Sequence, residues 1–122
     1  MRKILTVDDS TSMRQMVRAT LQSAGYGVVE AADGQEALDF ARGNSVDLVI
    51  SDVNMPRMDG ITLVGELRTL PAYRLTPLLL LTTESSQEKK MEGKRAGATG
   101  WIVKPFNPTQ LLATLNKLFG TA

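Results

Sequence analysis

Five residues whose side chains can do chemistry stand at the ends of short apolar runs of this sequence. They are Asp8, Asp9, Asp52, Thr82 and Lys104. The chain contains no histidine and no cysteine, so imidazole bases, thiol nucleophiles and most transition-metal sites are excluded. Any chemistry must therefore use carboxylates, amines, hydroxyls or a hard metal ion.

The three carboxylates indicate a metal site that handles a phosphoryl group. Carboxylates within several ångströms of one another repel unless a cation or protons intervene. Mg²⁺ fits best, because it takes oxygen ligands, keeps several waters and commonly combines one or two carboxylates with a phosphate. Beside it, the Lys104 ammonium and the Thr82 hydroxyl can stabilise a phosphoryl group. A carboxylate can accept that group directly as an aspartyl phosphate, and Asp52, central among the strands, is the best candidate.

These residues must be positioned by the alternation of strand and helix that runs along the chain. Short apolar runs predict strands at residues 4–7, 28–31, 48–51, 78–82 and 101–103, each followed by a helix-like segment. This alternation predicts an α/β fold with a parallel sheet, right-handed crossovers and five helices on its two faces. Five strands fit the doubly wound, flavodoxin-like order 2-1-3-4-5, in which ligands bind beyond the carboxyl ends of the first and third strands.

Capping signals predict where the helices begin. Three pairs have the capping-box spacing: Ser12 with Gln15, Asp33 with Glu36, and Asn107 with Gln110. The third helix is expected to end before Pro71. The fourth, at residues 86–96, has only Met91 and Ala96 as strongly apolar positions and contains Gly93. It should be the least firmly anchored helix.

The composition limits the class of protein. A chain of 122 residues with 43% hydrophobic content supports one domain. The 14 Lys and Arg residues nearly balance the 13 Asp and Glu residues, so no broad basic field is available to hold nucleic acid. No apolar run approaches the roughly 20 residues of a membrane span, and none resembles a secretory signal. We expect a cytoplasmic protein without nucleic-acid or membrane partners.

Four separated motifs resemble the receiver domain of bacterial two-component response regulators. They are VDDS at residues 7–10, SDVNMPRMDG at 51–60, LLLLTTE at 78–84 and GWIVKPF at 100–106. The resemblance covers nearly the whole chain, implies one receiver domain over residues 1–122, and is greatest to the single-domain regulators of chemotaxis. It implies a phosphoprotein that promotes its own phosphotransfer and dephosphorylation, rather than an enzyme acting on outside substrates.

The resemblance also implies metal-binding and acceptor roles at the predicted site. Asp52 is expected to be the phosphoacceptor. Mg²⁺ is expected to be bound by Asp9, Asp52 and the backbone carbonyl of Asn54, with Asp8 reaching the metal through water. The donor must be a phosphohistidine of another protein, since this chain has no histidine.

Further residues match the family's switch. Thr82 resembles the hydroxyl that moves toward the phosphoryl group, and Lys104 resembles the lysine that pairs with it. Asn54 and Glu84 resemble the residues that set how fast the phosphoryl group is lost. Trp101 stands where the family usually has tyrosine or another aromatic residue that swings inward on activation.

In the family, phosphorylation changes the face made by the fourth helix, fifth strand and fifth helix. Here the fourth helix carries Lys89, Lys90, Lys94 and Arg95, which could meet an acidic partner helix or form a solvated face. The implied partners are a histidine kinase of the chemotaxis type and a flagellar motor switch protein or a phosphatase. The protein itself is expected to be a monomer.

Three other functions compete with motor control. A phosphorelay intermediate or phosphate sink is the alternative output of a receiver. A flavin- or nucleotide-binding protein would use residues 10–12 as a phosphate loop, but Asp8 and Asp9 would repel a phosphate without a metal, and no Gly-x-Gly-x-x-Gly occurs there. A hydrolase with an aspartate nucleophile would need a second aspartate two positions later, where Asn54 stands.

Overall fold

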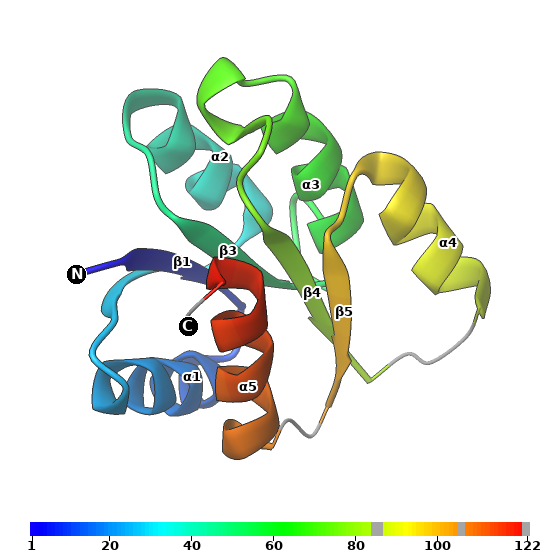
Figure 1. Ribbon diagram of the computed structural model, residues 1–122. Coiled ribbons are helices and arrows are strands. Elements are labelled where there is room, and N and C mark those ends of the chain that lie inside the picture. The colour runs from blue at the N-terminus through cyan, green and yellow to red at the C-terminus, as the bar shows by residue number, and fades with distance from the viewer. Residues whose placement is uncertain (84–86, 105–106, 121–122) are drawn as a thin grey trace.

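The short apolar runs form five strands in the described part of the chain. The computed structural model describes residues 1–83, 87–104 and 107–120. The strands are β1 Lys3–Val7, β2 Gly27–Ala31, β3 Leu48–Asp52, β4 Leu78–Thr82 and β5 Gly100–Val103. They lie in the order β2-β1-β3-β4-β5, and every neighbouring pair is parallel (Figure 1). The predicted α/β fold with flavodoxin-like strand order is confirmed.

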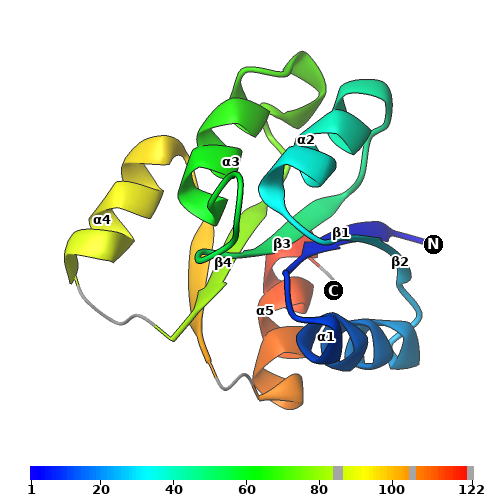
Figure 2. The same cartoon turned by 180° about the vertical axis from the view of Figure 1, so that it is seen from behind.

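The longer amphipathic segments form the helices between the strands. Within the described residues they are α1 Thr11–Ser23, α2 Gly34–Gly43, α3 Gly60–Arg68, α4 Gln87–Ala96 and α5 Pro108–Phe119, with a short 3-10 turn, η1, at Pro71–Tyr73. Helices α1 and α5 cover one face of the sheet, and α2, α3 and α4 cover the other (Figures 1 and 2). None of these described helices has both the length and the hydropathy that a membrane crossing needs.

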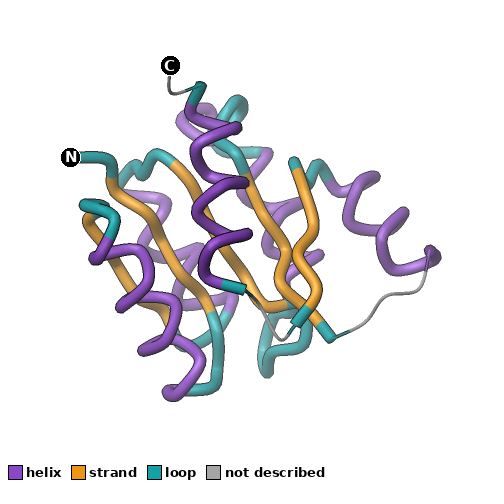
Figure 3. The backbone as a smooth tube through the Cα atoms, turned by 60° about the horizontal axis from the view of Figure 1, so that its bottom comes forward, coloured by secondary structure: helices purple, strands orange, loops and turns teal. Residues whose placement is uncertain are grey.

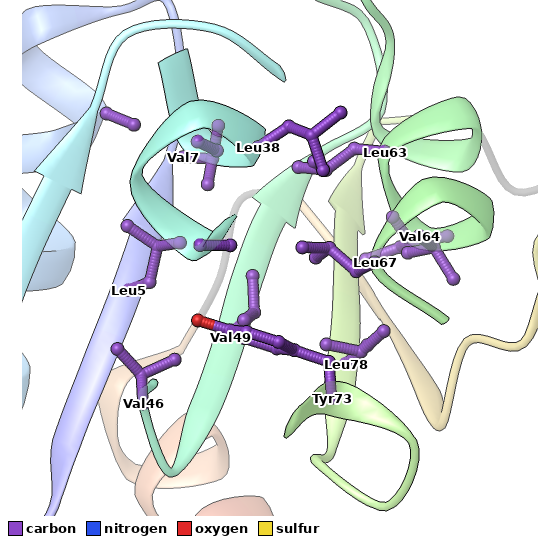
Figure 4. Close-up of a cluster of buried hydrophobic side chains, with 14 of the residues drawn as sticks. Leu5, Val7, Leu38, Val46, Val49, Leu63, Val64, Leu67, Tyr73 and Leu78 are labelled. Carbon is purple, nitrogen blue, oxygen red and sulfur yellow. The ribbon is translucent and has the colours of Figure 1, made fainter. Parts of the chain in front are cut away.

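Alternate strand residues enter two separate apolar cores. Toward α1 and α5, the buried strand residues are Ile4, Leu48, Ile50, Leu79 and Leu81. Toward α2 and α3, strand residues such as Leu5, Val49 and Leu78 pack with helix residues such as Leu38 and Leu67 (Figure 4). All residues of β3 and β4 are buried, which explains their continuous apolar runs.

The helix starts agree with two of the three capping predictions. Asp33 accepts a hydrogen bond from the Glu36 amide, and Asn107 accepts one from the Gln110 amide, as predicted. The first prediction was wrong, because α1 begins at Thr11 and its N-cap is Ser10 rather than Ser12.

A tight turn after β1 explains that difference. The Ser10 amide donates to Asp8 Oδ1 at 2.9 Å, and this turn leaves Ser10 Oγ 3.2 Å from the Met13 amide. Ser12 also carries a hydroxyl, but it lies within α1 and not at its N-cap. The capping position is set by the turn and cannot be read from the spacing of serine and glutamine alone.

Helix α4 approaches the sheet through a glycine rather than through a large apolar residue. Among its described residues only Gly93 is buried, and Met91 is 51% exposed. A Cβ at Gly93 would lie 2.8 Å from Leu80 Cδ1 and 3.1 Å from the Trp101 ring. Met91, one of the two strongly apolar positions of this helix, therefore does not anchor it to the sheet. Residue 86, the predicted start of this helix, lies outside the described residues.

Candidate functional site

The carboxyl ends of the parallel strands bring three carboxylates together. The described loop residues that follow the strands lie at one end of the sheet (Figure 3). Asp8, Asp9 and Asp52 each offer an oxygen atom, and these oxygens all lie within 4.8 Å of one another. Asp8 and Asp52 are buried, whereas Asp9 is exposed to solvent. The cluster thus has a closed inner side and one open side.

Lys104 supplies the positive charge of this cluster. Its Nζ atom lies 3.2 Å from Asp52 Oδ1 and 3.4 Å from Asp8 Oδ2. The lysine side chain is only 14% exposed, so this contact is poorly screened by solvent. Its backbone amide donates to the Thr82 carbonyl oxygen at 2.7 Å, which fixes the start of the loop after β5 against β4.

The surroundings of Asp52 disfavour the charged form of its carboxyl. Burial raises the pKa of the Asp52 carboxyl above its ordinary value of 3.8, and the neighbouring Asp8 carboxylate raises it further. Lys104 opposes both effects through its charge and hydrogen bond. One ammonium thus only partly compensates the carboxylates, and an additional cation would be stabilised here.

The carboxylate set fits Mg²⁺. All three side chains offer hard oxygen atoms, which this ion prefers over nitrogen or sulfur ligands. Asp9 lies on the solvent side of the cluster, where an ion could retain water molecules. The pKa of Asp52 is raised first by burial and then by the Asp8 carboxylate, so Lys104 alone does not offset both effects.

The first two aspartates are positioned by a network on α1 and β2. The Asp8 amide donates to the Ala31 carbonyl oxygen at 3.1 Å. Arg14 Nη1 donates to the Asp8 carbonyl oxygen at 2.6 Å, and Arg14 Nε pairs with Glu30 at 3.3 Å. The turn that carries Asp8 and Asp9 is therefore held from two neighbouring elements. Sequence reasoning missed Arg14, although its place one helical turn after Ser10 could have suggested it.

A glycine is required behind Asp52. The Gly60 amide donates to the Val53 carbonyl oxygen at 2.8 Å, which closes the loop after β3. A Cβ at Gly60 would overlap the Asp52 carbonyl oxygen and lie 3.1 Å from Leu80 Cδ2. Sequence reasoning treated this glycine only as the end of a motif. Its role is to let α3 begin directly against the strand that carries Asp52.

The remaining predicted residues differ in burial and in the element that carries them. Thr82 is fully buried at the end of β4, the strand next to β3. Asn54 is exposed in the loop two residues after Asp52. Glu84, predicted to control loss of the phosphoryl group, lies outside the described residues. The roles of these residues remain predictions.

Trp101 and two of the predicted lysines line one surface pocket. This pocket of about 300 Å³ lies between α4 and β5 and is bordered by Lys90, Lys94, Thr99 and Trp101. The Trp101 Nε1 atom is buried and has no hydrogen-bond partner among the described residues. Lys89 is not part of the lining and pairs with Glu92 at 3.6 Å.

Substitution Asp52→Asn is expected to raise the free energy of unfolding at neutral pH without Mg²⁺. The folded protein binds the Asp52 proton more tightly than the unfolded chain, because burial and Asp8 raise its pKa. Stability is therefore greatest below the unfolded-state pKa and is lost as pH rises through the folded-state pKa. The advantage of the variant should disappear on acidification. Thermal unfolding of both proteins from acid to neutral pH measures this difference in stability. Equal stability of the two proteins at neutral pH would contradict the raised pKa of Asp52.

The fold and this site define a class of protein. The protein is a doubly wound α/β domain with acidic residues and one lysine at the carboxyl edge of its sheet. Residues 4–116 match the model of the response regulator receiver domain, and the chain belongs to that family. The predicted resemblance is thus confirmed, and it places the chain among signalling proteins.

Similar proteins narrow the class to CheY-like receivers. Chemotaxis protein CheY-3 of Vibrio cholerae is 39% identical over 118 residues, which are 96% of this chain and 91% of that protein. The structure of Vibrio cholerae CheY4 has a TM-score of 0.93 and 58% identity, covering 97% of this chain and 98% of that one.

One similar structure, from Pseudomonas aeruginosa, contains a magnesium ion. The receiver domain of sensor histidine kinase PA1611 has a TM-score of 0.91 and 29% identity, with 98% of both chains covered. It was determined with a magnesium ion coordinated in its active-site cleft. This chain is therefore similar both to chemotaxis regulators and to the receiver of a sensor kinase.

Proposed function

We propose that this protein takes a phosphoryl group from a histidine kinase onto Asp52 and passes the signal on by contact with another protein. The observation that carries the proposal is the cluster itself, with three carboxylate oxygens within 4.8 Å and Lys104 Nζ 3.2 Å from Asp52 Oδ1. Membership of the receiver family supports the same assignment.

The proposed transfer needs only one new covalent bond on this chain. An Asp52 carboxylate oxygen attacks the phosphorus of a phosphohistidine on the kinase. The oxygen–phosphorus bond forms as the phosphorus–nitrogen bond breaks, and the leaving imidazole takes the electron pair and then a proton from water. Because a carboxylate requires no base to activate it, the absence of histidine from this chain is compatible with the reaction.

The other residues of the site orient the group and balance its charge. Asp8, Asp9, Asp52 and the Asn54 carbonyl would hold Mg²⁺, which when bound neutralises charge on the phosphoryl oxygens. Lys104 is already directed at Asp52 and would pair with one of those oxygens.

We assign the switch and the loss of the phosphoryl group to the surrounding residues. The Thr82 hydroxyl would donate to a phosphoryl oxygen, from its buried place at the end of β4. Asn54 and Glu84 would set the rate of hydrolysis. Burial of Thr82 supports its role, because a buried hydroxyl that changes partner is coupled to the packing around it.

The output surface in this proposal is the face of α4, β5 and α5. Lys90 and Lys94 beside the Trp101 pocket would meet an acidic segment of the partner. Similarity to chemotaxis proteins favours the flagellar motor switch as that partner, with a phosphatase to end the signal. We further propose that residues 1–122 act as one monomeric receiver in the cytoplasm.

Incubation with Mg²⁺ and acetyl phosphate tests the acceptor. We expect a mass gain of one phosphoryl group in the wild-type protein, none in Asp52→Asn, and a change in Trp101 fluorescence that requires labelling. Mass spectrometry of the intact protein measures the first result. Failure of the wild type to label, or labelling that persists in Asp52→Asn, would overturn the proposal.

Binding of the labelled protein distinguishes the outputs. A motor-switch protein peptide should bind the phosphorylated form more tightly than the unmodified form if the protein controls the motor. A phosphorelay intermediate or phosphate sink would instead exchange its label with a histidine phosphotransfer protein and show no gain in affinity for the peptide. Fluorescence titration and radiolabel transfer measure the two outcomes.

A further inference from the structure

The loop between β3 and α3, residues 53–59, rests on the start of α2. Its two ends are joined by the hydrogen bond from the Gly60 amide to the Val53 carbonyl oxygen. In its second half, the Met58 carbonyl lies so close to Gly34 that a Cβ there would come within 2.5 Å of the oxygen. This loop carries Asn54, so whatever fixes the loop also fixes the Asn54 backbone.

Arg57 occupies the strained position of this loop. Its φ angle is 67°, and among the described residues it is the only one other than glycine with a positive φ. This left-handed conformation costs free energy in any residue that has a Cβ, and asparagine and glycine tolerate it best. An arginine at this position therefore needs a compensating contact.

The compensating contact is a bidentate ion pair with Asp33. Arg57 Nε donates to Asp33 Oδ2 and Arg57 Nη2 donates to Asp33 Oδ1, both at 3.0 Å. The Asp33 side chain is 13% exposed, whereas the Arg57 side chain is 61% exposed. The pair thus joins a nearly fixed carboxylate to a loop that faces solvent.

Asp33 is itself fixed by the helix that it caps. Its Oδ1 atom accepts a hydrogen bond from the Glu36 amide at 2.9 Å at the N-terminus of α2. The Arg57 guanidinium, followed by the Glu36 amide, lowers the pKa of the Asp33 carboxyl below its ordinary value. The Asp33 carboxylate therefore stays charged throughout the neutral pH range, and its ion pair with Arg57 attaches the loop to α2.

We propose that Arg57 and Asp33 form a positioning clamp that holds the 53–59 loop, and with it the Asn54 carbonyl, in the place where Mg²⁺ is bound. The inference rests on the proposed function, because Asn54 is a proposed ligand there. Without the clamp, the loop loses this attachment to α2, and its backbone, including the Asn54 carbonyl, is held less firmly. Neither residue touches the metal or the reacting atoms, so both act through the loop.

Two substitutions separate the clamp from the capping of α2 and from the backbone strain. Asp33→Asn keeps a side-chain oxygen that caps a helix as well as aspartate does, but it removes the charge. Arg57→Asn removes the guanidinium and places a residue that tolerates the left-handed conformation. Arg42→Ala is the matched control, because it removes another exposed ion pair of α2, with Asp39 at 3.2 Å, and leaves the Arg57–Asp33 pair in place.

We expect both clamp variants to bind Mg²⁺ about two- to fivefold more weakly than the wild type, the range for one partly exposed ion pair. Isothermal titration calorimetry with MgCl₂ measures this change, and Arg42→Ala should match the wild type. The difference should shrink at about 0.5 M NaCl, where exposed charges are screened. In hydrogen exchange, the Met58 and Gly60 amides should lose protection in Asp33→Asn, while the Glu36 amide keeps it.

The outcomes distinguish this inference from the proposed function. If the wild type neither binds Mg²⁺ nor accepts a phosphoryl group, the proposed function fails. If the wild type does both and the two clamp variants bind Mg²⁺ as well as it does, the clamp is refuted and the proposed function stands. Weaker binding in Arg57→Asn with unchanged binding in Asp33→Asn would also refute the ion pair as the cause.

Discussion

Lys104→Ala is expected to lower the free energy of unfolding by about 2–4 kcal/mol in the absence of Mg²⁺. Lys104 lies 3.2 Å from Asp52 and 3.4 Å from Asp8, and both carboxylates are buried. Its removal leaves two buried negative charges without their partner, which costs more than the pair itself contributes. Chemical denaturation measures the loss. The rate of labelling by acetyl phosphate should fall by about 100-fold, since a charge directed at the reacting group is removed.

The cause of this loss can be isolated with two further variants and with Mg²⁺. Lys117→Ala removes an exposed lysine of α5 outside the site and should change neither stability nor labelling. Lys104→Ala combined with Asp52→Asn should regain most of the lost stability, because only one unpaired carboxylate remains. Mg²⁺ should stabilise Lys104→Ala more than it stabilises the wild type. If Lys104→Ala is as stable as the wild type without Mg²⁺, then Lys104 does not offset the free-energy cost of burying the two carboxylate charges.

Arg68→Met is expected to lower the free energy of unfolding by about 3–5 kcal/mol, or the melting temperature on the order of 10–20 °C. The Arg68 guanidinium donates to the carbonyl oxygens of Tyr73 at 2.6 Å, Thr76 at 2.8 Å and Gly97 at 2.9 Å. Burial lowers the pKa of this arginine, yet its bonds within the described residues all go to neutral oxygens. Methionine keeps the apolar stem and leaves those carbonyls without their donor. Thermal unfolding measures the change.

A neighbouring arginine provides the control for this prediction. Arg74 is exposed, and its replacement by alanine should change the free energy of unfolding by less than about 0.5 kcal/mol. Arg68→Lys should recover only a small part of the loss, because one ammonium cannot reach the acceptors on both segments, residues 73–76 and 97–99. A melting temperature of Arg68→Met close to that of the wild type would refute the importance of these bonds.

The fold could be predicted because its signals are local. Continuous apolar runs are required where a strand is buried on both faces, as β3 and β4 are. Two helix starts, at Asp33 and Asn107, could be predicted because each depends on one side chain that accepts a hydrogen bond from the amide three residues later. The third failed because Ser10 and Ser12 both offer a hydroxyl, and only the turn at Asp8 selects between them.

The candidate site was predictable in part for the same reason. Each aspartate of the cluster directly follows an apolar run, so the carboxyl edge of a parallel sheet brings them together. Lys104 was expected there too, but its distances to two of these aspartates depend on how β5 lies against β4. The chemical roles remain predictions until the labelling experiments are done.

The long-range contacts that hold the elements together could not be predicted, because they join residues far apart in sequence. Arg57 and Asp33 are 24 residues apart, and Arg68 and Gly97 are 29 apart. Arginine is usually a solvated surface residue, so its type alone gives no sign of such a role. The close approach of Gly93 to Leu80 is equally hidden, since a glycine in a helix is ordinarily only a weak point.

The strand order β2-β1-β3-β4-β5 also determines how the sheet can be assembled during translation. After β1 and β2 have paired, each later strand joins the edge left by an earlier one, and none is inserted between two strands already in place. The sheet can therefore grow in the order in which the ribosome, at about 5–20 residues per second, releases the chain. Until β5 emerges, the growing edge is β4 with its leucines, a segment open to pairing with other nascent chains.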